Sequence, residues 1–223
     1  MSATATIKIR GETLILHPYR AVIWPSRATA VVADTHFGKS SVFGRAGIAV
    51  PAGSDDADRA RLTQLVAAYD LHRVIVLGDF LHAPIATDSA EAAALQAWST
   101  SFRDVQIQVV AGNHDRGISD GWRGPIEWIA REAVEPPFRF IHDVSRLRSP
   151  TDEVFSLSGH IHPVIALRGL RKRSTRVPVF WSRRNDLVLP SFGSFTGGYL
   201  IRPASGEQVF AVGPDHVTAF PIR

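Results

Sequence analysis

Four short motifs carry the residues of this chain that could do chemistry. They are Asp34-x-His36, Gly78-Asp79, Gly112-Asn113-His114-Asp115 and Gly159-His160-x-His162. Carboxylate, imidazole and amide groups are nitrogen and oxygen ligands of divalent cations, and the chain has no cysteine that could supply a thiolate. Together the four motifs provide enough ligands to hold two such cations.

Each motif alone is weak evidence for a metal site. Asp-x-His arises by chance, Gly-Asp is common in turns, and Gly-Asn-His-Asp could be a turn rich in hydrogen-bonding side chains. The pair His160 and His162 is more specific, because residues i and i+2 of a strand point to the same face. For any single histidine, an exposed or internally satisfied polar residue remains the alternative, so the joint order of the motifs carries the metal hypothesis.

Three of the motifs directly follow an apolar run that is typical of a buried strand. The runs are Ala30-Val-Val-Ala33, Val74-Ile-Val-Leu77 and Gln108-Val-Val-Ala111. In open α/β sheets, ligands bind at the carboxyl ends of the strands. The sequence therefore places the candidate ligands at one edge of a sheet.

The elements that must position these motifs alternate between strand and helix up to about residue 110, and strands dominate afterwards. Strands are expected at 7–9, 13–17, 21–24, 28–33, 73–77, 106–111, 153–158, 163–168, 177–181, 187–189, 199–202 and 208–212. Helices are expected after Ser54, which precedes an acidic turn, and over Ser89–Phe102. The segment 116–132 is ambiguous and is expected to be partly helical. This order predicts a layered α/β structure, with residues 1–223 forming a single domain.

Phe37-Gly38-Lys39-Ser40 resembles the end of a phosphate-binding P-loop. That motif needs a glycine five residues before its second glycine, and Ala33 stands there. We therefore reject binding of a nucleoside triphosphate through this motif.

The composition limits the classes of protein to which this chain can belong. Hydrophobic residues make up 45% of the 223 residues, which is enough for a substantial core. The N-terminal sequence predicts no secretory signal, and no run of about 18 apolar residues predicts a membrane span. With no cysteine present, a cytoplasmic location is expected.

The basic character of the chain is concentrated in one stretch. Seven cationic residues lie between positions 168 and 184 without an acid among them: Arg168, Arg171, Lys172, Arg173, Arg176, Arg183 and Arg184. The formal net charge is +4, and it would be −3 without these seven residues. The stretch predicts a polyanionic partner, with a solvated basic loop as the alternative.

The four motifs, in this order and with a single histidine between the third and the fourth, resemble the calcineurin-like metallophosphoesterases. The resemblance implies a layered sandwich in which two mixed β-sheets pack face to face and are flanked by helices. It also implies that Asp34, His36 and His162 hold one metal, that Asn113, His160 and the single histidine hold the other, and that Asp79 bridges the two.

We take His142 as the single histidine, because it follows a predicted strand and lies between the third and fourth motifs. His82 is the competitor, and it is more simply explained as a residue that orients a ligand. His17, His72 and His216 match no motif and are interpreted as structural.

The resemblance implies a mechanism in which two divalent cations neutralise the phosphate oxygens and a hydroxide that bridges them attacks the phosphodiester. His114 would protonate the leaving oxygen or stabilise charge there, a contribution of roughly 10²–10⁴-fold. Asp115 would orient His114, as carboxylates often do for imidazoles.

Further segments resemble one bacterial branch, the DNA ligase-associated metallophosphoesterases, which are described as DNA-damage-response endonucleases. These segments are 34–40 continuing through 51, 159–163, 178–181 and 189–198. The resemblance implies a manganese-dependent endonuclease that prefers single-stranded DNA, with a DNA ligase and a helicase of a repair gene cluster as possible partners. Iron and zinc are also compatible with these ligands.

Several residues are candidates for contacts with DNA. The cations that could hold phosphates are Lys39, Arg45, Arg116, Arg168, Arg171, Lys172, Arg173 and Arg176. Phe180 and Trp181 could stack on bases, although core packing is the more favoured interpretation of both. The alternative functions are a small-molecule phosphodiesterase or phosphatase with the same metals, and a non-catalytic scaffold that retains the fold.

Overall fold

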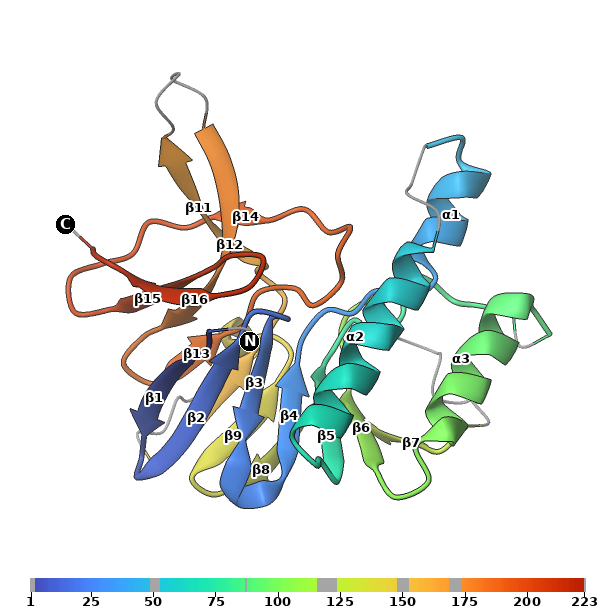
Figure 1. The fold of residues 1–223 in the computed structure, drawn as a ribbon, viewed down its shortest axis with the longest axis horizontal. Coiled ribbons are helices and arrows are strands. Elements are labelled where there is room, and N and C mark those ends of the chain that lie inside the picture. Colours follow the sequence, from blue (N-terminus) through green and yellow to red (C-terminus); the bar gives the residue numbers. More distant parts are fainter. Residues whose placement is uncertain are drawn as a thin grey trace.

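Two β-sheets packed against each other form the centre of the molecule (Figure 1). The computed structural model describes residues 3–48, 53–86, 88–115, 124–147, 153–168 and 174–222. Within these ranges, no helix is both long enough and apolar enough to cross a bilayer.

The first sheet has seven strands, and they follow one another in chain order. They are β1 (Ala5–Ile9), β2 (Glu12–His17), β3 (Ala21–Trp24), β4 (Thr29–Val32), β5 (Arg73–Leu77), β6 (Gln106–Val110) and β7 (Ile126–Ile129). The pairs from β1 to β4 are antiparallel, and the pairs from β4 to β7 are parallel. Every residue of β3 and β4 is buried, because both faces of the sheet are covered.

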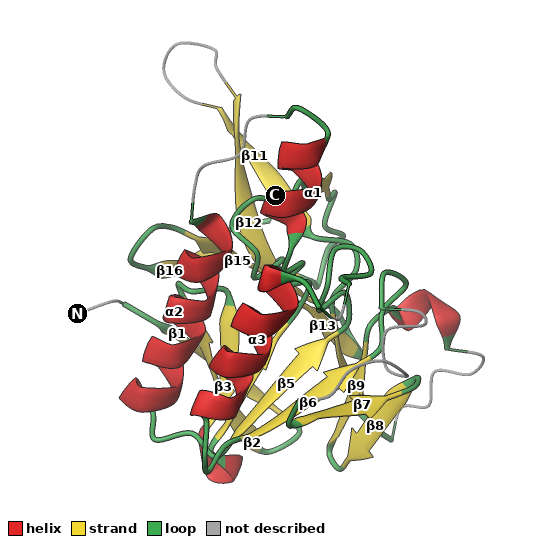
Figure 2. Cartoon of the chain, turned by 90° about the vertical axis from the view of Figure 1, so that its right-hand side faces the viewer, coloured by secondary structure: helices red, strands yellow, loops and turns green. Residues whose placement is uncertain are grey.

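Two helices cover one face of the first sheet, as Figure 2 shows. They are α2 (Ser54–Ala68) and α3 (Ala90–Ser101), and a shorter helix, α1 (Lys39–Arg45), precedes them. Leu62, Leu65 and Leu95 of the two longer helices form one apolar cluster with Val74 and Val76 of β5. A cap fixes the start of α3, where the Ser89 hydroxyl accepts a hydrogen bond from the Ala92 N–H at 3.1 Å.

The second sheet has nine strands, with β14, β11, β12, β13, β10, β9 and β8 in that spatial order and β15 and β16 attached beside β12. They are β8 (Glu132–Glu135), β9 (Phe138–Ile141), β10 (Phe155–Ser158), β11 (Pro163–Arg168), β12 (Ser174–Ser182), β13 (Asp186–Val188), β14 (Tyr199–Leu200), β15 (Gln208–Val212) and β16 (Val217–Phe220). Two 3₁₀ turns, η1 (Pro25–Arg27) and η2 (Val144–Arg146), complete the described elements. The sheet is mixed, since β10 runs parallel to both β9 and β13 while β12 runs antiparallel to its neighbours β11 and β13.

The main core lies between the two sheets. Leu14, Leu16 and Trp24 of the first sheet belong to one buried cluster with Phe138 and Phe140 of the second. The Trp24 and Phe138 rings meet edge to face, with centroids 4.9 Å apart. The predicted layered fold with two mixed sheets is therefore confirmed, and the described helices α2 and α3 form its third layer.

One expectation about the elements is not met in the part of its segment that the structure describes. The described part of the segment 116–132 contains no helix, and β7 instead adds to the parallel edge of the first sheet beside β6. Ile126 is buried there, so tertiary pairing outweighs the ambiguous local signal. Residues 116–123 lie outside the described ranges.

Candidate metal centre

The candidate ligands lie on loops that leave the carboxyl ends of neighbouring strands. In the first sheet, Asp34 and His36 follow β4, Asp79 follows β5 and Asn113 follows β6. Since β4, β5 and β6 are parallel neighbours, these three loops leave the sheet at the same edge. The predicted placement of the first three motifs is confirmed.

The second sheet brings the remaining ligands to the same place. His142 follows β9, and His160 and His162 follow β10, which is the parallel neighbour of β9. The two sheets meet here through a backbone contact, because the His160 N–H donates to Asp34 Oδ2 at 2.9 Å. The site therefore lies where the loops of both sheets converge.

The first group of potential ligands is Asp34, His36 and His162, whose ligand atoms all lie within 4.8 Å of one another. His162 Nε2 is 3.5 Å from Asp34 Oδ1. Asp34 has no exposed surface and His36 is only 5% exposed. A buried carboxylate flanked by two imidazoles is typical of a cation site.

The second group is Asp79, His142 and His160, with the same spacing. His142 Nε2 is 3.6 Å from Asp79 Oδ1, 3.1 Å from His160 Nδ1 and 3.1 Å from the Asn113 amide oxygen. His142 is thus placed among the ligands, whereas His82 belongs to neither group. Asp79 lies within the second group, and its bridging role stays a prediction.

Backbone carbonyls orient two of the imidazoles. His142 Nδ1 is 2.9 Å from the Leu77 oxygen, and His162 Nδ1 is 3.2 Å from the Gly197 oxygen. A carbonyl accepts, so each Nδ1 carries the proton and each Nε2 keeps a lone pair that a cation beside the neighbouring carboxylate can accept. This arrangement fixes the tautomer that a metal ligand needs.

Unsatisfied polar atoms also fit a cation at the first group. His36 Nδ1 and His162 Nε2 are buried and have no hydrogen-bond partner in the structure. Burial lowers the pKa of the His36 imidazole to about 2, so the ring stays neutral and able to ligate. Burial also opposes protonation of His162, but the proximity of the negatively charged Asp34 carboxylate raises its pKa above the ordinary value. The nitrogen and oxygen donor set suits manganese, iron or zinc.

The backbone of the site is strained. Among the described residues, nine non-glycine residues have positive φ, and five of these are candidate ligands. These five are Asp34 (φ 53°), His36 (48°), Asp79 (48°), His160 (70°) and His162 (49°). Left-handed backbone costs roughly 1–2 kcal/mol for such residues. Strain of this kind gathers at functional sites, where the surrounding structure imposes it.

The glycines of the motifs make room for the ligands. A Cβ on Gly159 would lie 2.6 Å from Asp34 Oδ2, and one on Gly112 would collide with Asp79. A Cβ on Gly78 would collide with the His142 ring. A side chain at any of these three glycines would therefore clash with a candidate ligand, a requirement that the motifs alone did not reveal.

His114 lies beside the two groups with its side chain 40% exposed. Its backbone N–H donates to Asp79 Oδ1 at 2.9 Å, and its Nδ1 is 2.8 Å from the His82 carbonyl oxygen. With Nδ1 occupied, Nε2 is the nitrogen that can face a substrate, and it lies 3.9 Å from Asp79 Oδ2. His82 stacks on the His114 ring, with centroids 5.4 Å apart.

The expected contact between Asp115 and the His114 imidazole is not what the structure shows. Asp115 is buried and accepts hydrogen bonds from the N–H groups of Phe80, Leu81 and Gly112, at 3.2, 3.1 and 2.9 Å. Burial raises the pKa of Asp115, although these three donors act in the opposite direction. Asp115 ties the loop after β6 to the loop after β5, and the His82 carbonyl is the group that orients His114.

The candidate DNA-binding cations are only partly described. Arg116, Arg171, Lys172 and Arg173 lie outside the described residues, and Arg45 and Arg168 end α1 and β11. Arg176 is exposed in β12, opposite Ala166, and donates to the Gly198 oxygen at 3.4 Å. Lys39 opens α1 directly after the Asp34-x-His36 motif, and burial lowers its pKa.

The described side chains of the basic stretch, Arg176, Arg183 and Arg184, do not form one patch. Arg183 and Arg184 follow the far end of β12, six or more strand residues from Arg176, which corresponds to roughly 20 Å. Arg183 is engaged there, because it bonds Asp186 at 2.7 Å and stacks on Trp181.

Phe180 and Trp181 serve packing. Phe180 has no exposed surface and belongs to the core between the sheets. Trp181 lies on the other face of β12, where its Nε1–H donates to Glu207 at 2.8 Å. The core interpretation of both aromatics is confirmed.

The structure adds supporting residues that the motifs did not indicate. Asp143 is 3.8 Å from His160 Nε2, and the Ser191 hydroxyl donates to the Asp34 carbonyl oxygen at 2.8 Å. Asp58 of α2 is buried and accepts from the Ser194 N–H at 2.8 Å. Only Asp143 had a signal in the sequence, since it directly follows His142.

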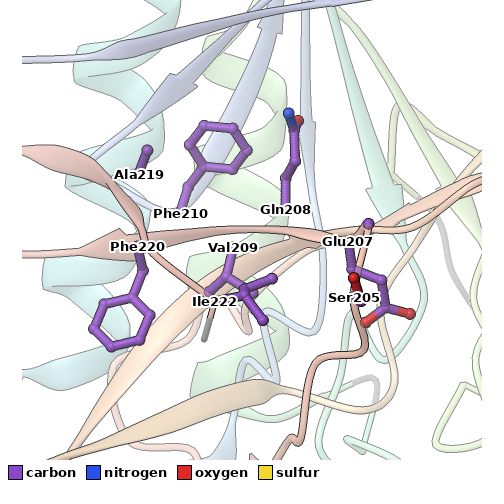
Figure 3. A pocket seen from close by; sticks show the side chains of 9 residues that line it. Ser205, Glu207, Gln208, Val209, Phe210, Ala219, Phe220 and Ile222 are labelled. Carbon is purple, nitrogen blue, oxygen red and sulfur yellow. The ribbon is translucent and has the colours of Figure 1, made fainter.

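A pocket away from this centre lies between β15, β16 and the preceding turn (Figure 3). Its lining includes Glu207, Val209, Phe210, Phe220 and Ile222, and it holds none of the candidate ligands.

The chain resembles known proteins in sequence and in structure. The family model for calcineurin-like phosphoesterases matches residues 28–207. The crystal structure of Pseudomonas putida nuclease MPE is 34% identical, with a TM-score of 0.82, and the match covers 97% of this chain and 100% of that chain. Yfce, a phosphoesterase from E. coli, is 17% identical with a TM-score of 0.47, covering 87% of this chain and 99% of that chain. None of the curated proteins matches the chain.

Proposed function

This chain belongs to the calcineurin-like phosphoesterase family, and we propose that within this family it is an endonuclease that cleaves single-stranded DNA. The observation that carries the proposal is the pair of adjacent ligand groups, Asp34, His36 and His162 beside Asp79, His142 and His160. The similarity to nuclease MPE of Pseudomonas putida supports a nucleic acid as the substrate.

The two groups would hold two divalent cations, with the Asn113 amide oxygen completing the second group and the Asp79 carboxylate facing both. Two bound cations supply charge neutralisation of the phosphate and a nucleophile at neutral pH. Asn113 is neutral, so it fills a ligand position without reducing the positive charge at the phosphate. We propose manganese as the native metal and DNA repair, beside a ligase and a helicase, as the context.

His114 is proposed as the residue that acts on the leaving group. Its Nε2 faces the ligand groups while the His82 carbonyl engages Nδ1, so a protonated Nε2 can donate to the departing oxygen. The hydrogen bond from its own N–H to Asp79 keeps the ring at a fixed distance from the reacting phosphate. A nearby cation, Lys39, could hold a phosphate oxygen.

Cleavage of circular single-stranded DNA tests the proposal, because a closed circle is cut only by internal cleavage. We expect manganese-dependent linearisation by the wild-type protein and roughly 10²–10⁴-fold slower cleavage by His114→Ala. The matched control is His216→Ala, since His216 is exposed and bonds Asp215, away from the ligand groups. Hydrolysis of a small chromogenic phosphodiester with an intact circle would instead favour a small-molecule phosphodiesterase.

Metal content separates the role of His114 from the roles of the ligands. After equilibration with manganese and desalting, His114→Ala should retain two bound ions, whereas Asn113→Ala should retain fewer. Loss of one ion in His114→Ala would assign His114 to the metal ligands, and fewer than two ions in the wild type would favour a scaffold.

A further inference from the structure

Two aromatic side chains line the rim of the metal centre. Phe43 of α1 lies edge to face against His82, with ring centroids 5.5 Å apart. His82 in turn contacts the rings of His36 and His114, at 5.5 and 5.4 Å. Phe195, in the loop between β13 and β14, packs edge to face on Phe43 at 6.2 Å. The aromatic contacts therefore run without a gap from the candidate ligands to the surface.

Phe195 is unusually exposed for a phenylalanine of this protein. Its exposed fraction is 40%, whereas the largest fully buried side chains include six phenylalanines. Burying a phenylalanine contributes roughly 1.5–3 kcal/mol. A large apolar ring left in water beside a catalytic centre is a surface that a ligand can cover.

The loop backbone that carries the exposed ring is anchored by hydrogen bonds on either side of it. Before it, the Ser194 N–H donates to the buried Asp58, and Arg61 donates to the Phe192 carbonyl oxygen at 2.7 Å. After it, the Thr196 hydroxyl donates to the Gly193 oxygen at 2.9 Å, and the Gly197 oxygen engages His162. A ring on an anchored loop loses little conformational freedom when a flat ligand stacks on it.

A positive charge accompanies the aromatic pair. The Lys39 ammonium lies 5.3 Å from the centre of the Phe43 ring. Both residues belong to α1, whose N-terminal cap, Gly38, lies two residues after His36. An aromatic face and a cation within one turn of helix match a ligand that has both a flat ring and a phosphate.

We propose that Phe43 and Phe195 form a stacking site for a nucleobase next to the scissile phosphate, with Lys39 contacting a phosphate oxygen of the same strand. This inference rests on the proposed nuclease function and assigns the residues that distinguish DNA from a plain phosphodiester. It replaces Phe180 and Trp181, which the fold uses for packing. Base–aromatic stacking is tolerant of sequence, because every base has a π-face.

The test compares phosphodiesters that share a leaving group and differ in the second ester group, which is a methyl group or a nucleoside that carries a base. Methyl 4-nitrophenyl phosphate has no base, and the 4-nitrophenyl esters of thymidine 5′- and 3′-phosphate carry a base on one side or the other of the phosphate. We expect the wild-type kcat/KM to favour one thymidine ester, and Phe195→Ala or Phe43→Leu to reduce this ratio by roughly 5- to 100-fold. Because a ratio is measured, partial loss of folded protein cancels.

Two further variants serve as controls for the loss of the Phe195 ring. Phe195→Tyr retains the ring and should retain the wild-type ratio. Phe220→Ala removes a phenylalanine of similar exposure, 37%, in the pocket of Figure 3, and should leave the ratio unchanged. An unchanged ratio in both Phe195→Ala and Phe43→Leu would overturn the inference while leaving the phosphodiesterase proposal intact.

Binding without turnover provides an independent measurement. Fluorescence anisotropy with a labelled oligothymidylate and with an abasic strand of equal length measures the preference for bases. The wild-type protein should prefer the strand with bases by roughly 5-fold or more, and Phe195→Ala should reduce that preference. Equal affinity of the wild type for both strands would contradict the stacking site, whether or not either strand is cut.

Discussion

His142 Nε2 lies 3.1 Å from His160 Nδ1, and the same nitrogen lies 3.1 Å from the Asn113 amide oxygen. Since the Leu77 carbonyl occupies His142 Nδ1, the three converging atoms share at most one proton. At most one of the two contacts can therefore be a hydrogen bond, and the other places two lone pairs 3.1 Å apart, an arrangement that a cation between them would stabilise. This relationship favours His142 as the ligand that lies between the third and fourth motifs. Before the structure, only the position of His142 in the chain had indicated this role.

Replacement of His142 should therefore remove one metal ion. We expect His142→Ala to retain one manganese ion per chain by elemental analysis after desalting. His82→Ala should retain two, because His82 orients His114 through its backbone carbonyl, which the substitution preserves. The reverse pattern, with one ion in His82→Ala and two in His142→Ala, would show that the assignment of the two histidines is wrong.

An added methyl group at Gly159 should disturb the first ligand group. The Cβ of Gly159→Ala would lie 2.6 Å from Asp34 Oδ2 and 2.7 Å from the Ala33 Cβ, and both neighbours are buried. We expect manganese affinity to fall about 10- to 100-fold by titration calorimetry, as it does when a ligand loses its support. Gly44→Ala is the control, since its Cβ would meet nothing within 4 Å. Equal affinity of both variants would contradict the steric argument.

The carboxylate of Asp58 should stabilise the loop that carries Phe192 and Ser194. Asp58 is 3% exposed, bonds Arg61 at 2.6 Å and accepts from the Ser194 N–H at 2.8 Å. Asp58→Asn should lower the free energy of unfolding by about 2 kcal/mol in urea titrations of the metal-free protein.

Asp56→Asn is the matched control for Asp58, because it removes an acid of the same helix that also pairs with an arginine three residues later. The Asp56 side chain is 77% exposed, so its ion pair contributes less than about 1 kcal/mol. Similar losses of unfolding free energy in the two variants would mean that the burial of Asp58 does not strengthen its contribution to stability.

The buried histidine of β2 makes stability depend on pH. Burial lowers the pKa of His17 to about 4, and its Nδ1 accepts the Tyr19 N–H at 3.0 Å. The unfolded chain binds this proton near pH 6.5 and the folded protein does not, so stability falls as the pH drops from about 6.5 to 4. The loss reaches up to about 3 kcal/mol.

His17→Asn places an amide oxygen where Nδ1 accepts, without a titrating group. The difference in unfolding free energy between wild type and His17→Asn should therefore shift in favour of the variant as the pH falls through this window. A difference that is constant from pH 7 to 4 would show that folding does not lower the pKa of His17.

The ligands of the first sheet could be predicted from sequence because a strict local rule applies. A buried parallel strand such as Val74–Leu77 can be recognised by its apolar run. The polar residue that follows it, Asp79, must then lie at the carboxyl edge of the sheet. His160 and His162 were predicted from their i, i+2 spacing, and the family resemblance then assigned them to different metals.

The features that could not be predicted from the sequence depend on contacts between residues far apart in the chain. The Asp58 carboxylate supports Ser194 from 136 positions away, and no local pattern records such a pairing. Strand β7 escaped prediction because Ile126–Ile129 is a strand only when β6 lies beside it. The position of Asp115 against the backbone of Phe80, rather than against His114, likewise depends on how two loops pack.

Each ligand group combines residues that are far apart in the chain. The two groups meet where Asp34 accepts a hydrogen bond from the backbone N–H of His160, 126 positions later. A ribosome-bound chain that ends before residue 160 has neither His160 nor His162, and it cannot complete either cation site. Hydrolytic activity is therefore withheld until most of the polypeptide has been synthesised. For the nuclease proposed above, this order of assembly would keep unfinished or truncated copies inactive.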